Sequence, residues 1–189
     1  MTTRVTAHPF SAGDLQAALR RLNTGVSIVT ALVIALALFG SGYLLLFPRE
    51  AAGYLGISPK LVLFSQGAVP LHLRLLLALL PGIALVIVTA TKIRALFNRF
   101  ARGAILDQTN ARLMSMIGRL IIAGGAVSMA QRTLLGLALT LDNPAGQKQL
   151  VISLSVNDFI IALFGLFVLA FAHVIGEGAR LADENRTFV

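Results

Sequence analysis

The stretch KIRALFNRFARGAILDQTNARLMSMIGR, residues 92–119, decides how this chain is organised. It lies between two long apolar segments and is much richer in basic side chains than either of them. Basic residues in short connections between membrane spans mark the cytosolic side of a membrane protein. The stretch is therefore predicted to be a cytosolic hairpin that joins two membrane-spanning helices.

The composition places the whole chain in a membrane. Hydrophobic residues make up 57% of its 189 residues, charged residues only 13%, and the mean hydropathy is +0.84. A soluble domain carries about 25% charged residues, and a chain of 20.0 kDa has too small an interior to hide this much apolar surface, so lipid must cover it. The predicted fold class is an all-α integral membrane bundle of four transmembrane helices with amphipathic cytosolic extensions.

Four apolar stretches are long enough to cross a hydrocarbon core of roughly 30 Å. They cover about residues 25–47, 75–93, 117–141 and 150–175 of a single domain, 1–189. Before the first span, residues 12–22 place leucine and alanine on one helical face and arginine off it. This segment is predicted to be a short helix lying in the membrane surface, with a floppy basic tail as the alternative.

The positions of the basic residues predict the orientation. With a cytosolic N-terminus, ten basic residues fall on the cytosolic side: Arg4, Arg20, Arg21, Lys92, Arg94, Arg99, Arg102, Arg112, Arg180 and Arg186. Four fall on the other side: Arg49, Lys60, Arg74 and Lys148. Both termini are therefore predicted to be cytoplasmic, in a cell inner membrane. This asymmetry also accounts for the net charge of +8, and no direct nucleic-acid partner is expected because no nucleic-acid motif is present.

The predicted hairpin is a candidate binding surface. Its basic side chains are Lys92, Arg94, Arg99, Arg102 and Arg112. They suit anionic lipid, at about 1 kcal/mol per well-placed Lys or Arg, and they equally suit an acidic patch on a cytosolic regulatory protein. A role in topology alone is the third alternative, and the residues leave all three open.

Two charged residues lie inside the predicted spans. Arg132 belongs to a stripe of Ser128, Arg132, Gly136 and Thr140, the spacing of a helix face that packs closely. Arg132 is expected about 14 Å, and Asp158 about 12 Å, from the non-cytosolic ends of their helices. Since charges at such depth face a partner or water, the two are predicted to pair, either as a structural contact or as part of a substrate or proton pathway. Snorkelling of the charges to the interface is the remaining alternative.

A second candidate cluster lies near the cytosolic ends of the same two spans. Arg119 and Glu177 are placed to form an ion pair, and His173 lies one turn before Glu177. A lone intramembrane histidine can ligate haem or carry protons. The chain has no cysteine and no second well-placed histidine, so neither a cofactor nor a metal site is predicted.

The sequence lacks the motifs of the common catalytic sites. It has no H-E-x-x-H, no G-x-S-x-G and no phosphate-binding Gly–Lys loop, so no enzyme is expected. The function predicted first is a non-enzymatic regulatory or scaffolding protein that presents its basic hairpin to a partner. The alternatives are a small transporter or channel subunit that uses the polar stripe of the third span, and a subunit of a larger membrane complex.

Two segments, FNRFARGAILDQTNARLMSMIGRLI (97–121) and GEGARLADENRTFV (176–189), resemble a known family. In the bacterial membrane-protein family called domain of unknown function 2975, a Phe–basic–Gly turn precedes an Asn-containing helix start, and the chain ends in a similar acidic tail. The resemblance runs roughly from the second span to the C-terminus. It implies a four-helix bundle and, because members often lie beside helix-turn-helix regulators, a regulatory role, but no catalytic residue. Where the family has an acidic residue and then Phe after the turn glycine, this chain has Ala104 and Leu106.

Overall fold

The computed structural model describes residues 12–62, 69–104, 107–144, 146–148, 150, 152 and 154–187. Its regular elements are all helical: α1 (Ala12–Leu46), α2 (Pro48–Tyr54), the 3-10 helix η1 (Pro59–Leu61), α3 (Leu71–Ala101), α4 (Gln108–Thr140) and α5 (Val156–Thr187). Helices α1, α3, α4 and α5 are long and apolar enough to cross a membrane. The predicted all-α membrane architecture is confirmed.

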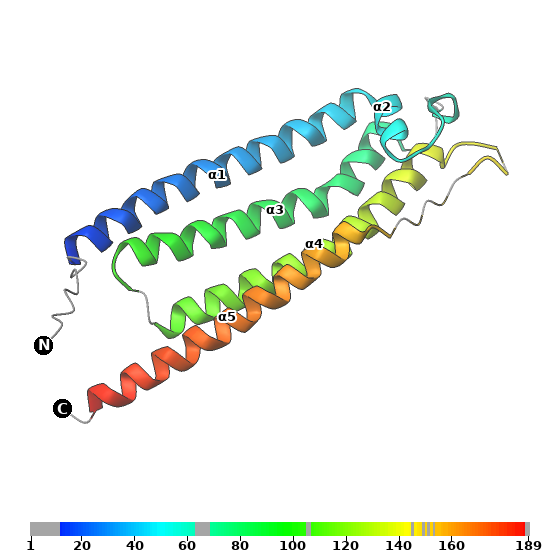
Figure 1. Cartoon of the computed structure of the whole chain (residues 1–189). Helices are drawn as coiled ribbons and strands as arrows, with labels where there is room; N and C mark the ends of the chain where they lie inside the picture. Colours follow the sequence, from blue (N-terminus) through cyan, green and yellow to red (C-terminus); the bar gives the residue numbers. More distant parts are fainter. Residues whose placement is uncertain are drawn as a thin grey trace, which may run out of the picture.

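The four long helices lie side by side in chain order (Figure 1). Helix α1 packs on α3, α3 on α4, and α4 on α5. The start of α1, the end of α5 and the α3–α4 turn share one end of the molecule, here called the hairpin end; α2, η1 and the α4–α5 connection lie at the other, the cap end (Figure 1). The chain therefore enters and leaves at the hairpin end, as the charge distribution predicts. That this end faces the cytoplasm stays a prediction.

The best-buried apolar side chains gather at the cap end. Helix α2 begins with Pro48, whose fixed φ suits the first helical position. The turn after α2 is closed by Gly56 at φ +70°, a conformation that favours glycine. This connection packs on α3 and α4 through a shared core: Ala51, Ala52, Ile57, Val62, Leu71, Leu75, Ala78, Leu79, Leu135, Ala138 and Leu139. Residues of α2 and of the described segment after it thus pack with α3 and α4 in one core at the cap end.

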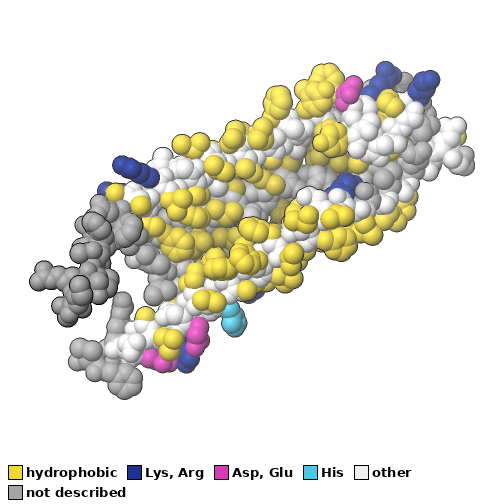
Figure 2. All heavy atoms as spheres, viewed as in Figure 1, with side chains coloured by type: hydrophobic (Ala, Val, Ile, Leu, Met, Phe, Trp, Pro, Cys, Tyr) yellow, Lys and Arg dark blue, Asp and Glu magenta, His cyan; other side chains and the backbone are white. Residues whose placement is uncertain are grey.

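In the middle of the molecule, many large apolar side chains are exposed on the surface. Leu36, Phe39 and Leu163 are among the large hydrophobic residues exposed there, with Phe39 at 75%. Figure 2 shows hydrophobic side chains over the middle of one face and charged side chains gathered towards its ends. Apolar surface of this extent suits contact with lipid rather than water.

Two predicted boundaries are wrong. Residues 12–22 do not form a separate surface helix, because α1 runs unbroken from Ala12 to Leu46. No proline interrupts this stretch, and the Thr24 hydroxyl donates to the Arg20 carbonyl oxygen at 3.2 Å within a continuous helix. The last long helix begins at Val156, whereas the predicted span began at residue 150. The reason is a capping box, in which the Ser155 backbone N–H donates to Asp158 Oδ2 at 3.1 Å.

Candidate functional site

The turn between α3 and α4 is held by a network of side chains. Asp107 caps α4 by accepting from the Thr109 backbone N–H at 2.7 Å. Arg99, in the last turn of α3, forms an ion pair with Asp107 and donates from Nε to Asn110 Oδ1 at 2.6 Å. Asn110 is 0% exposed and donates in turn to the Ala104 carbonyl oxygen at 2.5 Å. The network ties the end of α3 and Ala104 to the start of α4.

The Asp107 carboxylate is stabilised in its charged form. The Thr109 backbone N–H and then its hydroxyl lower the pKa of Asp107, and Arg99 lowers it further. A carboxylate at a helix N-terminus also interacts favourably with the helix dipole. The cap of α4 is therefore negatively charged at neutral pH.

The five basic residues predicted as the hairpin surface separate into two groups. Arg94, Arg102 and Arg112 are exposed, and Lys92 is half-buried. Arg99 is committed to Asp107 and Asn110, so it holds the turn instead of offering a free charge. Arg99 therefore also serves as the ion-pair partner of the residue that caps α4. That the five residues form a surface for a partner or for lipid stays a prediction.

Arg132 and Asp158 meet as the sequence predicts. Arg132 Nη2 lies 2.6 Å from Asp158 Oδ1, and the Ser128 hydroxyl donates to the same oxygen at 2.6 Å. Asp158 is 4% exposed, while the Arg132 side chain is 27% exposed. The carboxylate thus has three donors once the Ser155 N–H is included, which compensates its burial.

The position of Asp158 differs from the expected one. It was expected about 12 Å inside its helix, whereas it lies in the first turn of α5. The pair forms there because Asp158 closes the capping box at the start of α5 while α4 passes beside it. The two helices are close at this point, since a Cβ on Gly125 of α4 would lie 3.0 Å from the Asp158 carbonyl oxygen. The contact therefore fastens the beginning of α5 to the side of α4.

The second predicted cluster is only partly assembled. Glu177 Oε1 accepts from Arg180 Nη2 at 2.5 Å, and Arg180 Nη1 lies 3.0 Å from Glu184 on the same helix. The predicted ion pair between Arg119 and Glu177 is wrong, because Arg180, one turn away, takes the carboxylate. Arg119, His173 and Glu177 nevertheless line one groove of about 630 Å³ between α4 and α5.

An ion pair at the cap end was not predicted from the sequence. Arg74, in the first turns of α3, pairs with Asp142, just after the end of α4. From the sequence, Arg74 was counted only among the four basic residues on the non-cytosolic side. Two features of the sequence could have predicted this ion pair. The start of α3 and the end of α4 must lie close together if the two helices are antiparallel neighbours, and Arg74 and Asp142 at these ends carry opposite charges.

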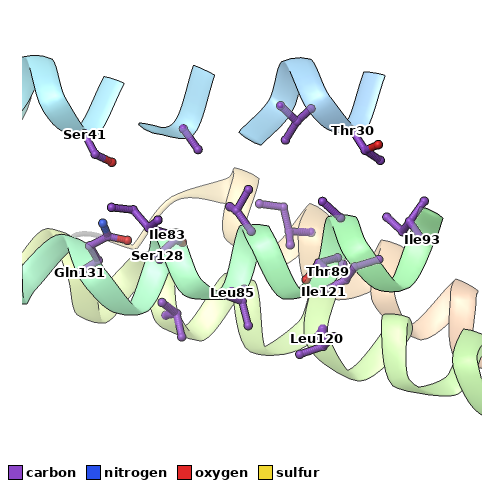
Figure 3. Close-up of a pocket in the computed structure, with 18 of the residues that line it drawn as sticks. Thr30, Ser41, Ile83, Leu85, Thr89, Ile93, Leu120, Ile121, Ser128 and Gln131 are labelled. Carbon is purple, nitrogen blue, oxygen red and sulfur yellow. The ribbon is translucent and has the colours of Figure 1, made fainter. Parts of the chain in front are cut away.

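A larger groove lies among the long helices and is mainly apolar. It has a volume of about 660 Å³ and is lined by residues from α1, α3 and α4 and by Ile161 of α5. In Figure 3, Thr30 and Ser41 point from α1 towards α3 and α4, and Gln131 and Ser128 lie on the opposite wall. Gln131 reaches over Gly82 of α3, where any Cβ would overlap its amide. Within the part of the chain that the structure describes, no group of three His, Asp or Glu side chains is placed to hold a metal ion.

Comparison with known proteins places the chain in a family. No curated protein and no solved structure matches it. One family model, described as a protein of unknown function (DUF2975), matches residues 14–189. The match extends the resemblance seen in the hairpin and the C-terminal segment to nearly the whole chain. This protein therefore belongs to the DUF2975 family.

Proposed function

We propose that this protein is a non-enzymatic regulatory or scaffolding protein of a bacterial inner membrane, and that it docks a cytosolic protein on Arg94 and Arg102 of its hairpin. The observation that carries the proposal is the positive charge that Arg94 and Arg102 expose beside the hydrogen-bonded junction of α3 and α4. Arg94 and Arg102 are exposed, and neither forms an ion pair with another described residue. Close to them, Arg99 donates to Asn110 and Asn110 donates to the Ala104 carbonyl oxygen, which ties the end of α3 to the start of α4.

These hydrogen bonds between α3 and α4 favour binding. A surface that is already ordered loses less conformational entropy when a partner binds. Exposed arginines on such a surface suit an acidic partner, for which electrostatic complementarity raises the association rate and makes binding sensitive to salt. The positive-inside rule supports a cytosolic location for the hairpin and hence a cytosolic partner.

The transporter alternative has less support. The polar stripe expected to line a pathway has its charges engaged, since Arg132 is paired with Asp158 at 2.6 Å. The groove beside Ser128 and Gln131 is lined mostly by aliphatic side chains. A solute pathway needs polar groups along its length to replace water, and this groove offers only a few.

The test is a capture experiment with matched variants. Membranes containing the tagged full chain are incubated with cytosolic extract, and retained proteins are identified by mass spectrometry. The hairpin variant is Arg94→Gln/Arg102→Gln, and the control is Arg20→Gln/Arg21→Gln, which removes the same charge from exposed positions at the same end. We expect a protein that is retained by the wild type and the control, released by salt, and lost from the hairpin variant. Equal retention by all three chains would refute docking at the hairpin.

A further inference from the structure

The groove between α4 and α5 at the hairpin end combines positive charge with an open cavity. Its charged and titratable lining residues are Arg112 and Arg119 on α4 and His173, Glu177 and Arg180 on α5. Glu177 is paired with Arg180 at 2.5 Å, and Arg180 is shared with Glu184 at 3.0 Å. Arg112 and Arg119 are exposed and form no ion pair with a described residue, so the groove keeps their two charges uncompensated.

The spacing of the lining residues places them on the facing sides of α4 and α5, around one pocket. Arg112, Ser115 and Arg119 lie at i, i+3 and i+7, so they share a face of α4. His173 and Glu177 lie four residues apart and face them from α5. Gln108 bridges the two helices at the outer end of the groove by donating to the Gly176 carbonyl oxygen at 3.0 Å. The result is a pocket of about 630 Å³ that both helices line with side-chain donors.

The surroundings distinguish a lipid from a free ion. Towards the middle of the molecule, the face of α5 that carries His173 continues with Ala170 and Leu166, both exposed. The face of α4 that carries Arg119 continues with the half-buried Ala123 and the exposed Ala126. A basic pocket that opens onto a smooth apolar track matches a headgroup phosphate with its acyl chain alongside the helices.

We propose that this groove binds the phosphate of an anionic phospholipid from the leaflet at the hairpin end. Arg112 and Arg119 contact the phosphate, and one acyl chain runs along α4 and α5 over Ala126 and Leu166. Lipid binding at the groove and protein docking at the hairpin use different arginines. Either proposal can fail while the other holds.

The test compares lipids on the full chain purified in a nonionic detergent. The protein is titrated with phosphatidylglycerol or with phosphatidylcholine of the same acyl chains, and bound lipid is counted by native mass spectrometry. A third arm uses inorganic phosphate at matched ionic strength. We expect preferential binding of phosphatidylglycerol and no binding of inorganic phosphate at the same concentration. Equal binding of the two lipids would overturn the proposal, and competition by inorganic phosphate would show a free-phosphate site instead.

Variants locate the binding. In Arg112→Gln/Arg119→Gln the affinity for phosphatidylglycerol should fall about 30-fold, since each basic residue near a membrane surface contributes about fivefold. The hairpin variant Arg94→Gln/Arg102→Gln removes the same charge and should retain most of the affinity. An equal loss in both variants would show a bulk charge effect and refute a specific groove.

Two further variants distinguish loss of the lipid site from misfolding of the chain. Ser115→Asp leaves both arginines in place but adds a carboxylate between them, at helical spacings that favour ion pairs. It should displace phosphatidylglycerol while preserving the helix. Arg112→Lys/Arg119→Lys keeps the charge and should retain most of the binding. Lipid binding that persists in Ser115→Asp would contradict the proposed site.

Discussion

The crossing of α4 and α5 makes a sharp prediction, because glycine is required there by contact rather than by backbone conformation. A Cβ on Gly165 would lie 2.6 Å from Ile122 Cγ1 and 2.9 Å from the Gly118 carbonyl oxygen. Non-bonded carbon atoms prefer about 3.5–4.0 Å, so in Gly165→Ala the two helices must separate by about 1 Å. By contrast, a Cβ on Gly124 would meet Leu85 Cδ2 at 3.5 Å, an ordinary contact.

The magnitude follows from comparing the two variants. A gap of about 0.5–1 Å forfeits a quarter to a half of each dispersion contact across it, and overpacking of this kind costs about 1–3 kcal/mol. Alanine is favoured over glycine inside a helix by about 1 kcal/mol, and this gain is common to both variants. Gly165→Ala should therefore be less stable than Gly124→Ala by about 1–3 kcal/mol. Gly124→Ala should be at least as stable as the wild type.

The measurement is the unfolding of each full chain in the same detergent, followed by far-UV circular dichroism. Each kcal/mol corresponds to roughly 2–4 °C in Tm for a chain of about this size. The wild type and Gly124→Ala serve as the controls for helix propensity. If Gly165→Ala were as stable as Gly124→Ala, α4 and α5 would not meet at this crossing, and the packing described above would be wrong.

Three further predictions concern the charged and polar networks. Arg132→Leu and Asp158→Leu should each lower the folded yield, because each leaves the other charge unpaired. The double variant should recover much of the folded yield, and additive losses in the double variant would exclude the pairing. Asn110→Ala should destabilise the chain by about 1–3 kcal/mol, because it leaves buried polar groups in the turn unsatisfied, whereas Thr109→Ala should lose less in the same unfolding assay. In the folded protein the pKa of Asp107 lies below its ordinary value of 3.8. The ionised Asp107 carboxylate therefore stabilises the fold above pH 3.8, and this stabilisation is lost as the pH falls through the folded-state pKa. Asp107→Asn keeps a capping side chain and should flatten this acid limb in thermal scans against pH; an unchanged acid limb would remove Asp107 as its cause.

Several features could be predicted from the sequence because they depend on local properties. Hydropathy summed along the chain identifies four spans, and an even number of spans puts both ends of the chain on one side. The cap of α4 also has a local signal in the sequence, because Asp107 stands just before a helical pattern. The pairing of Arg132 with Asp158 could be inferred because the two charges were expected at similar depths in consecutive spans and a buried charge needs a partner.

Hydropathy also misled at one point. Leu150, Ile152 and Leu154 are apolar enough to look like the beginning of the last span, but the helix starts after them. The Ser155–Asp158 capping box that sets the start of α5 was present in the sequence. Hydropathy averaged over many residues does not detect it, because the capping box is a hydrogen bond between two particular residues.

Only the tertiary structure decided which faces of the helices meet. Helical periodicity places residues on a face, but the rotation of each helix about its axis depends on its neighbours. The close contact of Gly118 with Gly165 sets that rotation for α4 and α5. It leaves Glu177 with Arg180 on its own helix and opens the groove beside Arg119. Packing across helices is a property of pairs of surfaces, so no single segment of the sequence contains it.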